Sequence, residues 1–341
     1  MKTRLPVALS CLLLSLSVSL VTGCSALDRE TGRASASGSS PSFPTASEGE
    51  FSVMTFNLHR YRLQEPGPDS DSLDPRPPAS ADALANVIRQ VSPDILAVQE
   101  MGDPAAWAEF KYRLRQAGLE YRYEEYLPRP PRHLNLAVLS RFPIVGRASL
   151  TNDIYTIGPT KFPVQRGFIE LDIEITPAYR LRLINAHLKS KAFHEYGQAE
   201  MRRNEARLLG NHVRRALDEN PHVNLLVVGT LNDAPGSRSM REIYSYQGTD
   251  LLFDLRPADS AGDAWTLRTP NDTHHRSDYM FTASGLLNET LLPKTYAVRS
   301  PLLLNATDHR PLVATFVARE QDPAAAPDLS ARHPPEFPDD N

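Results

Sequence analysis

The chain has 341 residues and a formal net charge of −4, with 41% hydrophobic and 23% charged residues. This composition is that of an ordinary globular protein, and the length allows one large α/β domain or two small ones. The mild acidity argues against a protein that binds nucleic acid through a broad basic surface, although local basic patches can still hold phosphate.

The N-terminus has the pattern of an export signal. Lys2 and Arg4 precede an apolar run, residues 5–20, that is short for a membrane-spanning helix. Val21-Thr22-Gly23-Cys24 then resembles a bacterial lipobox, which predicts a signal peptide over residues 1–23 and lipidation of the Cys24 thiol. An ordinary signal peptide followed by a chance cysteine is the alternative.

The expected anchor also bears on location and thiol chemistry. By resemblance to Gram-negative lipoproteins, Ser25 directly after the cysteine favours the outer membrane, with the domain facing the periplasm. Cys11 lies in the segment that would be removed, so the mature chain would keep only Cys24. That leaves no disulfide, no thiolate nucleophile and no cysteine-ligated zinc.

Composition divides the rest of the chain into three parts. Residues 24–49 are rich in Ser, Ala, Gly and Thr, which predicts a flexible tether that cannot bury a core. Residues 50–318 carry the strand and helix patterns of a folded domain. Residues 319–341 are charged and proline-rich, so we expect a disordered tail.

Apolar runs and amphipathic stripes predict the elements of the domain. Strands are expected over 51–58, 93–100, 121–126, 135–140, 166–175, 179–186, 223–229, 264–267, 274–281 and 312–318. Helices are expected from a Ser80 cap to residue 91, from an Asp103 cap to Gly118, over 198–217 and over 237–246. A polar, proline-rich loop is expected over 61–79. Two sheets packed face to face, with helices outside, would bury all these strands and predict an α/β fold.

Several of these strands end in, or follow, a polar residue of one chemical type. Oxygen-bearing side chains of this kind are Asn57, Glu100, Asn232, Asp278 and Asp308, and the imidazoles are His187 and His309. Hard divalent cations prefer such oxygen ligands, completed by water and substrate phosphate. Histidines beside them can bind phosphoryl oxygens or move a proton. Each residue alone has an ordinary explanation as a turn residue, a solvated carboxylate or a surface pair, so the argument depends on the joint pattern.

The order of these motifs resembles that of the endonuclease/exonuclease/phosphatase superfamily, which has the deoxyribonuclease-I-like fold. The matching segments are Met54-Thr55-Phe56-Asn57, Leu96-Ala97-Val98-Gln99-Glu100, Asn185-Ala186-His187-Leu188, Val228-Gly229-Thr230-Leu231-Asn232, Arg276-Ser277-Asp278-Tyr279 and Thr307-Asp308-His309. The resemblance covers about residues 50–318. It implies a four-layer α/β sandwich of two packed mixed sheets flanked by helices, and hydrolysis of phosphate esters with Mg²⁺ or Mn²⁺.

The resemblance also implies a role for each motif residue. Glu100 would hold the metal, with Asn57 and Asp308 contributing to its site, while His187 and Asn232 would bind the phosphoryl group. Asp278 would pair with His309, which would act as general base or as transition-state stabiliser. Arg166 and Arg141 stand where the family often has basic residues and are expected to bind substrate.

One position departs from the family pattern. Where the family has Asp in Gly-Asp-x-Asn, this chain has Thr230, expected to face a cleft beyond the strand that ends at Gly229. A threonine hydroxyl cannot act as a base near neutral pH, and losing a general base typically costs about 10²–10⁴-fold in rate. Asp233 is close in sequence but is expected to point elsewhere.

Two functions are therefore open. The first is a metal-dependent phosphodiesterase or nuclease-like phosphoester hydrolase on the cell envelope, attached to the membrane through its lipid only and expected to be a monomer. Its substrate would be nucleic acid, a nucleotide or a phospholipid headgroup. The second is a catalytically impaired pseudoenzyme that binds a phosphate ligand or a partner protein, because of Thr230.

Overall fold

A computed structural model describes residues 43–63, 75–129, 134–149 and 152–321. The predicted signal peptide, Cys24 and most of the expected tether and tail lie outside these residues. Among the residues that the structure describes, no helix is long and apolar enough to cross a membrane.

The first sheet brings the N-terminal and C-terminal strands of the domain together. Strand β1 is parallel to β2 and antiparallel to β18, and β2 is antiparallel to β4. Its strands, in spatial order, are β17 (Tyr296–Ala297), β18 (Leu312–Val317), β1 (Glu50–Tyr61), β2 (Ile95–Met101), β4 (Asn135–Ser140) and β3 (Tyr123–Leu127).

The second sheet is built around another parallel pair, β9 and β10, with β16 antiparallel to β10. Strands β8 and β9 form the hairpin that the alternating sequence over 166–186 predicts. The strands, in spatial order, are β13 (Phe253–Asp254), β16 (Asp278–Thr282), β10 (Leu225–Thr230), β9 (Tyr179–His187), β8 (Phe168–Thr176) and β5 (Ile144–Arg147).

Helices and short hairpins complete the described part. The helices are α1 (Pro78–Val91), α2 (Pro104–Gln116), α3 (Gln198–Glu219), α4 (Arg238–Tyr244) and α5 (Ser284–Leu287), with 3₁₀ turns η1 (Leu292–Lys294) and η2 (Pro301–Asn305). Three two-stranded ribbons pair β6 (Ile154–Ile157) with β7 (Thr160–Pro163), β11 (Ser245–Tyr246) with β12 (Thr249–Asp250), and β14 (Leu267–Arg268) with β15 (His274–His275).

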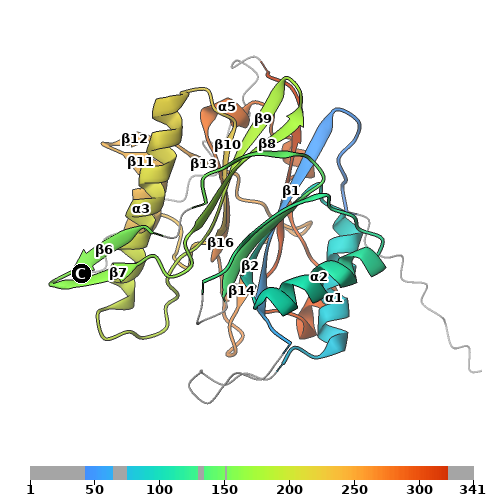
Figure 1. Cartoon of the computed structure of the whole chain (residues 1–341), viewed down its shortest axis with the longest axis horizontal. Helices are drawn as coiled ribbons and strands as arrows, with labels where there is room; N and C mark the ends of the chain where they lie inside the picture. The colour runs from blue at the N-terminus through green and yellow to red at the C-terminus, as the bar shows by residue number, and fades with distance from the viewer. Residues whose placement is uncertain (1–42, 64–74, 130–133, 150–151, 322–341) are drawn as a thin grey trace, which may run out of the picture. The chain divides into compact units, whose positions relative to one another are not determined.

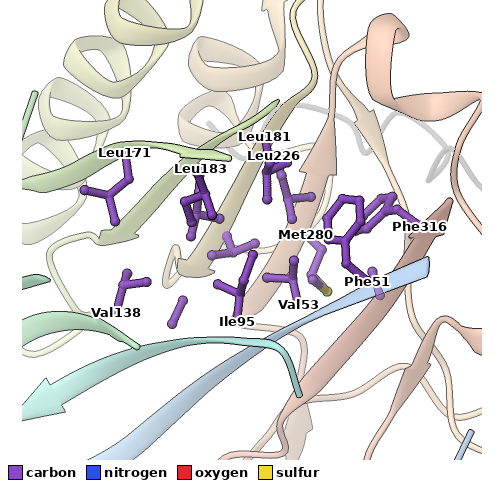
Figure 2. Close-up of a cluster of buried hydrophobic side chains, with 14 of the residues drawn as sticks. Phe51, Val53, Ile95, Val138, Leu171, Leu181, Leu183, Leu226, Met280 and Phe316 are labelled. Atoms are coloured by element: carbon purple, nitrogen blue, oxygen red, sulfur yellow. The ribbon is translucent and has the colours of Figure 1, made fainter. Parts of the chain in front are cut away.

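Three apolar cores separate four layers, as the family resemblance implies. The central core lies between the two sheets, where Phe51 and Ile95 of the first sheet pack with Leu183, Leu226 and Met280 of the second (Figure 2). A second core joins the first sheet to α1 and α2, and a third joins the second sheet to α3 and α4. Helices α1 and α2 lie on one side of the sheets and α3 on the other (Figure 1). The predicted α/β sandwich is therefore confirmed.

The buried strands explain why this arrangement is stable. Residues alternate between the two faces of a strand, so Phe51 and Val53 of β1 enter the central core while Met54 and Phe56 enter the helix-covered core. Each fully buried side chain of this size contributes about 1.5–3 kcal/mol relative to exposure. Strands that are apolar on both faces need a packed layer on each face. Here the other sheet covers one face of each sheet and helices cover the other.

Three local predictions differ from the structure. The strand expected over 274–281 is divided between β15 and β16, which belong to different sheets. Helix α1 begins at Pro78 with Pro77 as its cap, because proline is suited to the first helical position. Ser80 therefore lies inside the first turn, where its hydroxyl accepts a hydrogen bond from Arg76 at 2.6 Å. The expected strand over 264–267 is shifted to Leu267–Arg268, where it pairs with β15.

The packed region is also wider than residues 50–318. Phe43, expected in the tether, stacks on Tyr296 with ring centroids 5.7 Å apart. At the other end, the backbone N–H of Gln321 donates to Glu289 at 2.8 Å. These contacts pack flanking residues against the domain, although composition alone predicted an unpacked chain there.

Candidate active site

Strand direction gathers the predicted site residues at one edge of both sheets. Asn57 and Glu100 lie near the ends of the parallel strands β1 and β2, and His187 and Thr230 end the parallel strands β9 and β10. Asp278 begins β16, which is antiparallel to β10, so it reaches the same edge. Asp308 and His309 directly precede β18, which is antiparallel to β1. We call this group, together with Asn232, the site edge.

A buried polar seam joins the two sheets beneath the site edge. Gln99 of β2 donates from its amide to Asn185 of β9 at 2.8 Å and to Thr55 of β1 at 3.0 Å. Asn185 donates in turn to the backbone carbonyls of Val98 and Ala137. All these side chains are buried, so the seam fixes how the sheets approach each other at this end.

Asn57 connects the sheets one step closer to the surface. Its amide nitrogen donates to the Thr230 hydroxyl at 3.0 Å and to Glu100 Oε1 at 3.3 Å. Its amide oxygen accepts the backbone N–H of His59 at 2.9 Å. The amide is thus fully engaged, and it presents N–H groups to the Glu100 carboxylate.

Glu100 combines a strained backbone with a weakly compensated charge. Its φ of +61° lies in the left-handed region, at an irregularity in the pairing of β2 with β4. Its side chain is 15% exposed. Within the described residues, its neighbours at hydrogen-bond or ion-pair distance are the Asn57 amide and the His187 ring, whose Nε2 lies 3.8 Å from Oε1. Both neighbours are weak partners for a carboxylate in this position.

The two site histidines are held in opposite charge states. Burial, with the positive charges of Arg166 and His309 nearby, holds the pKa of His187 well below its usual range. Burial also lowers the pKa of His309, but the carboxylates of Asp278, Asp308 and Glu100 outweigh it and raise the pKa to about 9. Without a bound metal, these shifts favour a neutral ring at His187 and a protonated ring at His309.

Asp278 and His309 form a buried pair. His309 Nδ1 lies 2.7 Å from Asp278 Oδ2, and the other Asp278 oxygen accepts the Thr230 hydroxyl at 2.7 Å. The backbone N–H of Asp278 donates to Thr266 Oγ1 at 2.9 Å, which anchors the start of β16. His309 Nε2 is left facing Asp308, whose Oδ1 is 3.8 Å away.

Thr230 is not at an exposed tip, as the sequence suggested. It is the last residue of β10 and only 1% exposed, because strand pairing continues through Gly229 to Thr230 on both neighbours. Asn232 lies beyond the strand with a φ of +60° and donates to the Leu188 carbonyl at 2.8 Å. Asp233 does point elsewhere, because it accepts a hydrogen bond from Arg202 at 3.0 Å.

The two arginines expected to bind substrate are placed differently. Arg166 is buried beside the site edge, donates to the Leu188 carbonyl at 3.2 Å and lowers the pKa of His187. Arg141 is at the opposite end of the first sheet, where it donates to Asp94 at 3.0 Å and Ser92 at 2.8 Å. Its expected role at the site is wrong because β4 is antiparallel to β2, which sends the end of β4 toward the start of β2.

His59 also belongs to the site edge, although no sequence pattern marked it. Its ring is 48% exposed, and Nδ1 lies 2.5 Å from Asp308 Oδ1. Arg76 holds this turn by donating to the carbonyls of Leu58 and His59, and His59 has a φ of +49°. Burial raises the pKa of Asp308, but the His59 contact and the His309 charge lower it below its usual value.

The donor set decides which metal could fit. Among the described residues, no cluster of three or more His, Cys, Asp or Glu side chains has the arrangement of a metal centre. A closed zinc-type site is therefore not formed by them. The weakly compensated Glu100 carboxylate, with Asp308 nearby, suits a hard cation that keeps several waters and takes its remaining ligands from phosphate. The residues present fit such an ion.

Alternation along the strands could have revealed two more of the missed residues. Residues two apart on a strand share a face, so Asn185 lies on the face of His187. Gln99 lies two residues beyond Ala97, which faces the central core, and so it points toward the second sheet. Buried amides within apolar strands are unusual and must find partners. No comparable signal marks His59, because its contact with Asp308 spans almost the whole domain.

Comparison with known proteins identifies the family of the chain. Residues 54–309 match the endonuclease/exonuclease/phosphatase family. No curated protein matches the chain by sequence.

Solved structures share the fold at low identity. Truncated TDP2 from Caenorhabditis elegans is 21% identical, with a TM-score of 0.54 over 79% of this chain and 98% of that one. The human Nocturnin catalytic domain with bound sulfate is 16% identical, with a TM-score of 0.57 over 79% and 94%. ANGEL2, a 2',3'-cyclic phosphatase, is 16% identical, with a TM-score of 0.56 over 78% and 95%.

Proposed function

The chain belongs to the endonuclease/exonuclease/phosphatase family, and from that premise we propose that it is a divalent-metal-dependent phosphoester hydrolase. Members of this family are phosphoester hydrolases and generally depend on a divalent metal. The observation that carries the proposal is the meeting of Glu100, Asp278 and His309 at one edge of the two sheets. A carboxylate that can hold a metal and a histidine held by a buried carboxylate can together stabilise the charge that develops on a phosphoryl group.

The side chains of this site have complementary tasks. The His309 imidazolium can donate from Nε2 to a phosphoryl oxygen, or give its proton to the leaving oxygen. Asp278 holds the other ring nitrogen and so fixes the orientation of the ring. No described residue forms a hydrogen bond with the buried His187 Nδ1, and the neutral ring would bind the phosphoryl group. Asn232 has a second amide N–H for the same purpose.

Glu100 and Asp308 would hold Mg²⁺ or Mn²⁺, with Asn57 orienting the Glu100 carboxylate. When bound, the cation supplies positive charge that stabilises the phosphoryl oxygens in the transition state. Arg166 adds a fixed positive charge beside His187.

The experiment is a hydrolysis panel on the purified domain, from residue 43 to residue 321. The substrates are bis-p-nitrophenyl phosphate, single-stranded DNA, adenosine 2',3'-cyclic phosphate and a phosphatidylcholine vesicle, each with Mg²⁺, Mn²⁺ or EDTA. The cyclic nucleotide is included because ANGEL2 is a 2',3'-cyclic phosphatase. We expect metal-dependent turnover that Glu100→Gln lowers by about 10²-fold or more.

A matched control is Glu124→Gln, which removes a carboxylate on β3 that pairs with Lys111 of α2. It should leave turnover unchanged. Absence of metal-dependent turnover on every substrate would contradict the proposal. Phosphate or nucleotide binding without turnover would instead support the alternative function, a catalytically impaired binding module in which Thr230 replaces the family aspartate.

We propose further that the domain is attached to the outer membrane of a Gram-negative cell envelope through lipidated Cys24 and faces the periplasm. The support is the lipobox pattern of residues 21–24. Mass spectrometry of the protein purified from cells should find Cys24 at the N-terminus, with acyl chains attached to it. A mature protein in which Cys24 carries no lipid would show that Cys24 is not the anchor.

A further inference from the structure

Thr230 lies at the centre of a row of polar side chains. Strand β10 pairs with β9 and with β16, so Thr230 is directly beside His187 on one neighbour and Asp278 on the other. Directly opposed residues on neighbouring strands point to the same face of a sheet. His187, Thr230 and Asp278 therefore project together toward the first sheet, from which Asn57 reaches back.

The Thr230 hydroxyl joins the two halves of the site. It accepts a hydrogen bond from the Asn57 amide at 3.0 Å and donates one to Asp278 Oδ1 at 2.7 Å. Asn57 also donates to Glu100, and Asp278 also holds His309 Nδ1. We propose that Thr230 is a positioning residue, which couples the Glu100–Asn57 pair to the Asp278–His309 pair and fixes the Asp278 carboxylate.

A hydroxyl suits this position better than the family's aspartate would. A hydroxyl both accepts and donates, whereas an ionised carboxylate only accepts. In Thr230→Asp, a second carboxylate would lie at hydrogen-bond distance from Asp278 in a buried place, and like charges that close cannot both stay ionised. The threonine is therefore part of a different arrangement of the site, and restoring the aspartate should not repair it.

The test uses three substitutions at this position and one control. Thr230→Val keeps the shape of the side chain and removes the hydroxyl, Thr230→Ser keeps the hydroxyl, and Thr230→Asp restores the family residue. The control is Thr282→Val, which removes a buried hydroxyl bonded to the Leu225 carbonyl at the opposite end of the second sheet. Each protein is examined by steady-state kinetics and, without metal, by proton NMR of the His309 ring N–H, assigned with His309→Gln.

The expected result separates the hydroxyl from the shape of the side chain. Thr230→Val should lower kcat by about 10–100-fold with little change in KM, because partners behind a catalytic group act on its orientation. It should also shift or broaden the His309 N–H resonance. Thr230→Ser should recover most of both properties, and Thr230→Asp should lower kcat as well. Thr282→Val should change neither the rate nor the resonance.

The kinetic readout rests on the proposed function, but the resonance does not. If the wild-type protein hydrolyses nothing, the proposed function fails while the N–H resonance still decides the role of Thr230. The positioning role is overturned if Thr230→Val keeps the wild-type resonance and rate, or if Thr230→Asp raises kcat. Should Thr230→Val fail to fold, the contrast between Thr230→Ser and Thr230→Asp gives the same decision.

Discussion

The two ends of the first sheet each carry a polar cluster, and the clusters differ in how completely they are paired. At the far end, Ser52, Ser92, Asp94 and Arg141 form what we call the far cluster. There Asp94 Oδ2 accepts Ser52, and Oδ1 accepts Arg141, whose second nitrogen reaches Ser92. Each of these polar side chains has a hydrogen-bond partner within the cluster. This is expected of polar groups that only stabilise the fold.

The site edge leaves groups unpaired, strained or shifted in charge. In the part of the chain that the structure describes, the buried His187 Nδ1 has no hydrogen-bond partner, and Glu100 and Asn232 adopt left-handed backbone conformations. The pKa values of the two histidines move in opposite directions from the same starting value. Such features lower the stability of the folded state, and in proteins they cluster at binding and catalytic sites.

The largest effect should come from breaking the Asp278–His309 pair at the site edge. His309→Gln keeps a hydrogen-bond donor for Asp278 but removes the imidazolium, so kcat should fall by about 10²–10⁴-fold. Steady-state kinetics on the most rapidly hydrolysed substrate of the panel measures this loss. Unchanged turnover would mean that the pair serves only to hold the fold.

The comparison variant breaks the far cluster instead. Asp94→Asn removes the charge that pairs with Arg141, and Asn cannot accept on both sides. The free energy of unfolding should fall by about 1–3 kcal/mol, while kcat stays unchanged. Urea titration measures the first quantity. A loss of kcat without a loss of stability would contradict the division into a structural and a functional end.

The smallest effect concerns a buried carboxylate behind the site edge. Glu205 on α3 accepts the backbone N–H of Lys189 at 2.6 Å, and burial raises its pKa above 4.5 despite nearby Arg166. As the pH rises past about 4.5, the unfolded chain ionises first, so the folded state loses stability until its own raised pKa is passed. Glu205→Gln should remove this decline.

Urea titrations between pH 4.5 and pH 8 measure the pH dependence of unfolding for Glu205→Gln and for a control. The control is Glu219→Gln, at the exposed end of the same helix, where Glu219 pairs with Arg182. It should leave the decline in place. An identical pH dependence in Glu205→Gln and in the wild type would show that ionised Glu205 does not lower the free energy of unfolding.

Most of the fold could be predicted because its signals are local. Alternation over 166–186 gave the β8–β9 hairpin, and Asp103-Pro104 gave the start of α2, where Asp103 accepts the N–H of Ala106. The predicted start of α1 was wrong because Ser80 is a good capping residue and Pro78 a good first helical residue. In the structure Pro78 begins the helix, and the Ser80 hydroxyl bonds to Arg76 instead of capping it. Local patterns therefore located elements well and their ends less well.

The site was predicted in part, and the limits have a physical cause. Strand-end polar residues were found because parallel and antiparallel strands send defined ends to one edge. Arg141 was misassigned because sequence does not tell which end of the sheet a strand end will reach. His59 was missed because its partner Asp308 is distant in the chain.

The sequence by itself determined the layered α/β fold, the row of oxygen and imidazole side chains at strand ends, and the presence of a hydroxyl at position 230. The tertiary structure decided what that hydroxyl does. Only the register of β10 against β16 places it on Asp278, and only the packing of the two sheets brings Asn57 to it. The same packing sets the charges of His187 and His309, because burial and neighbouring charges, which come from folding, decide the pKa of a side chain.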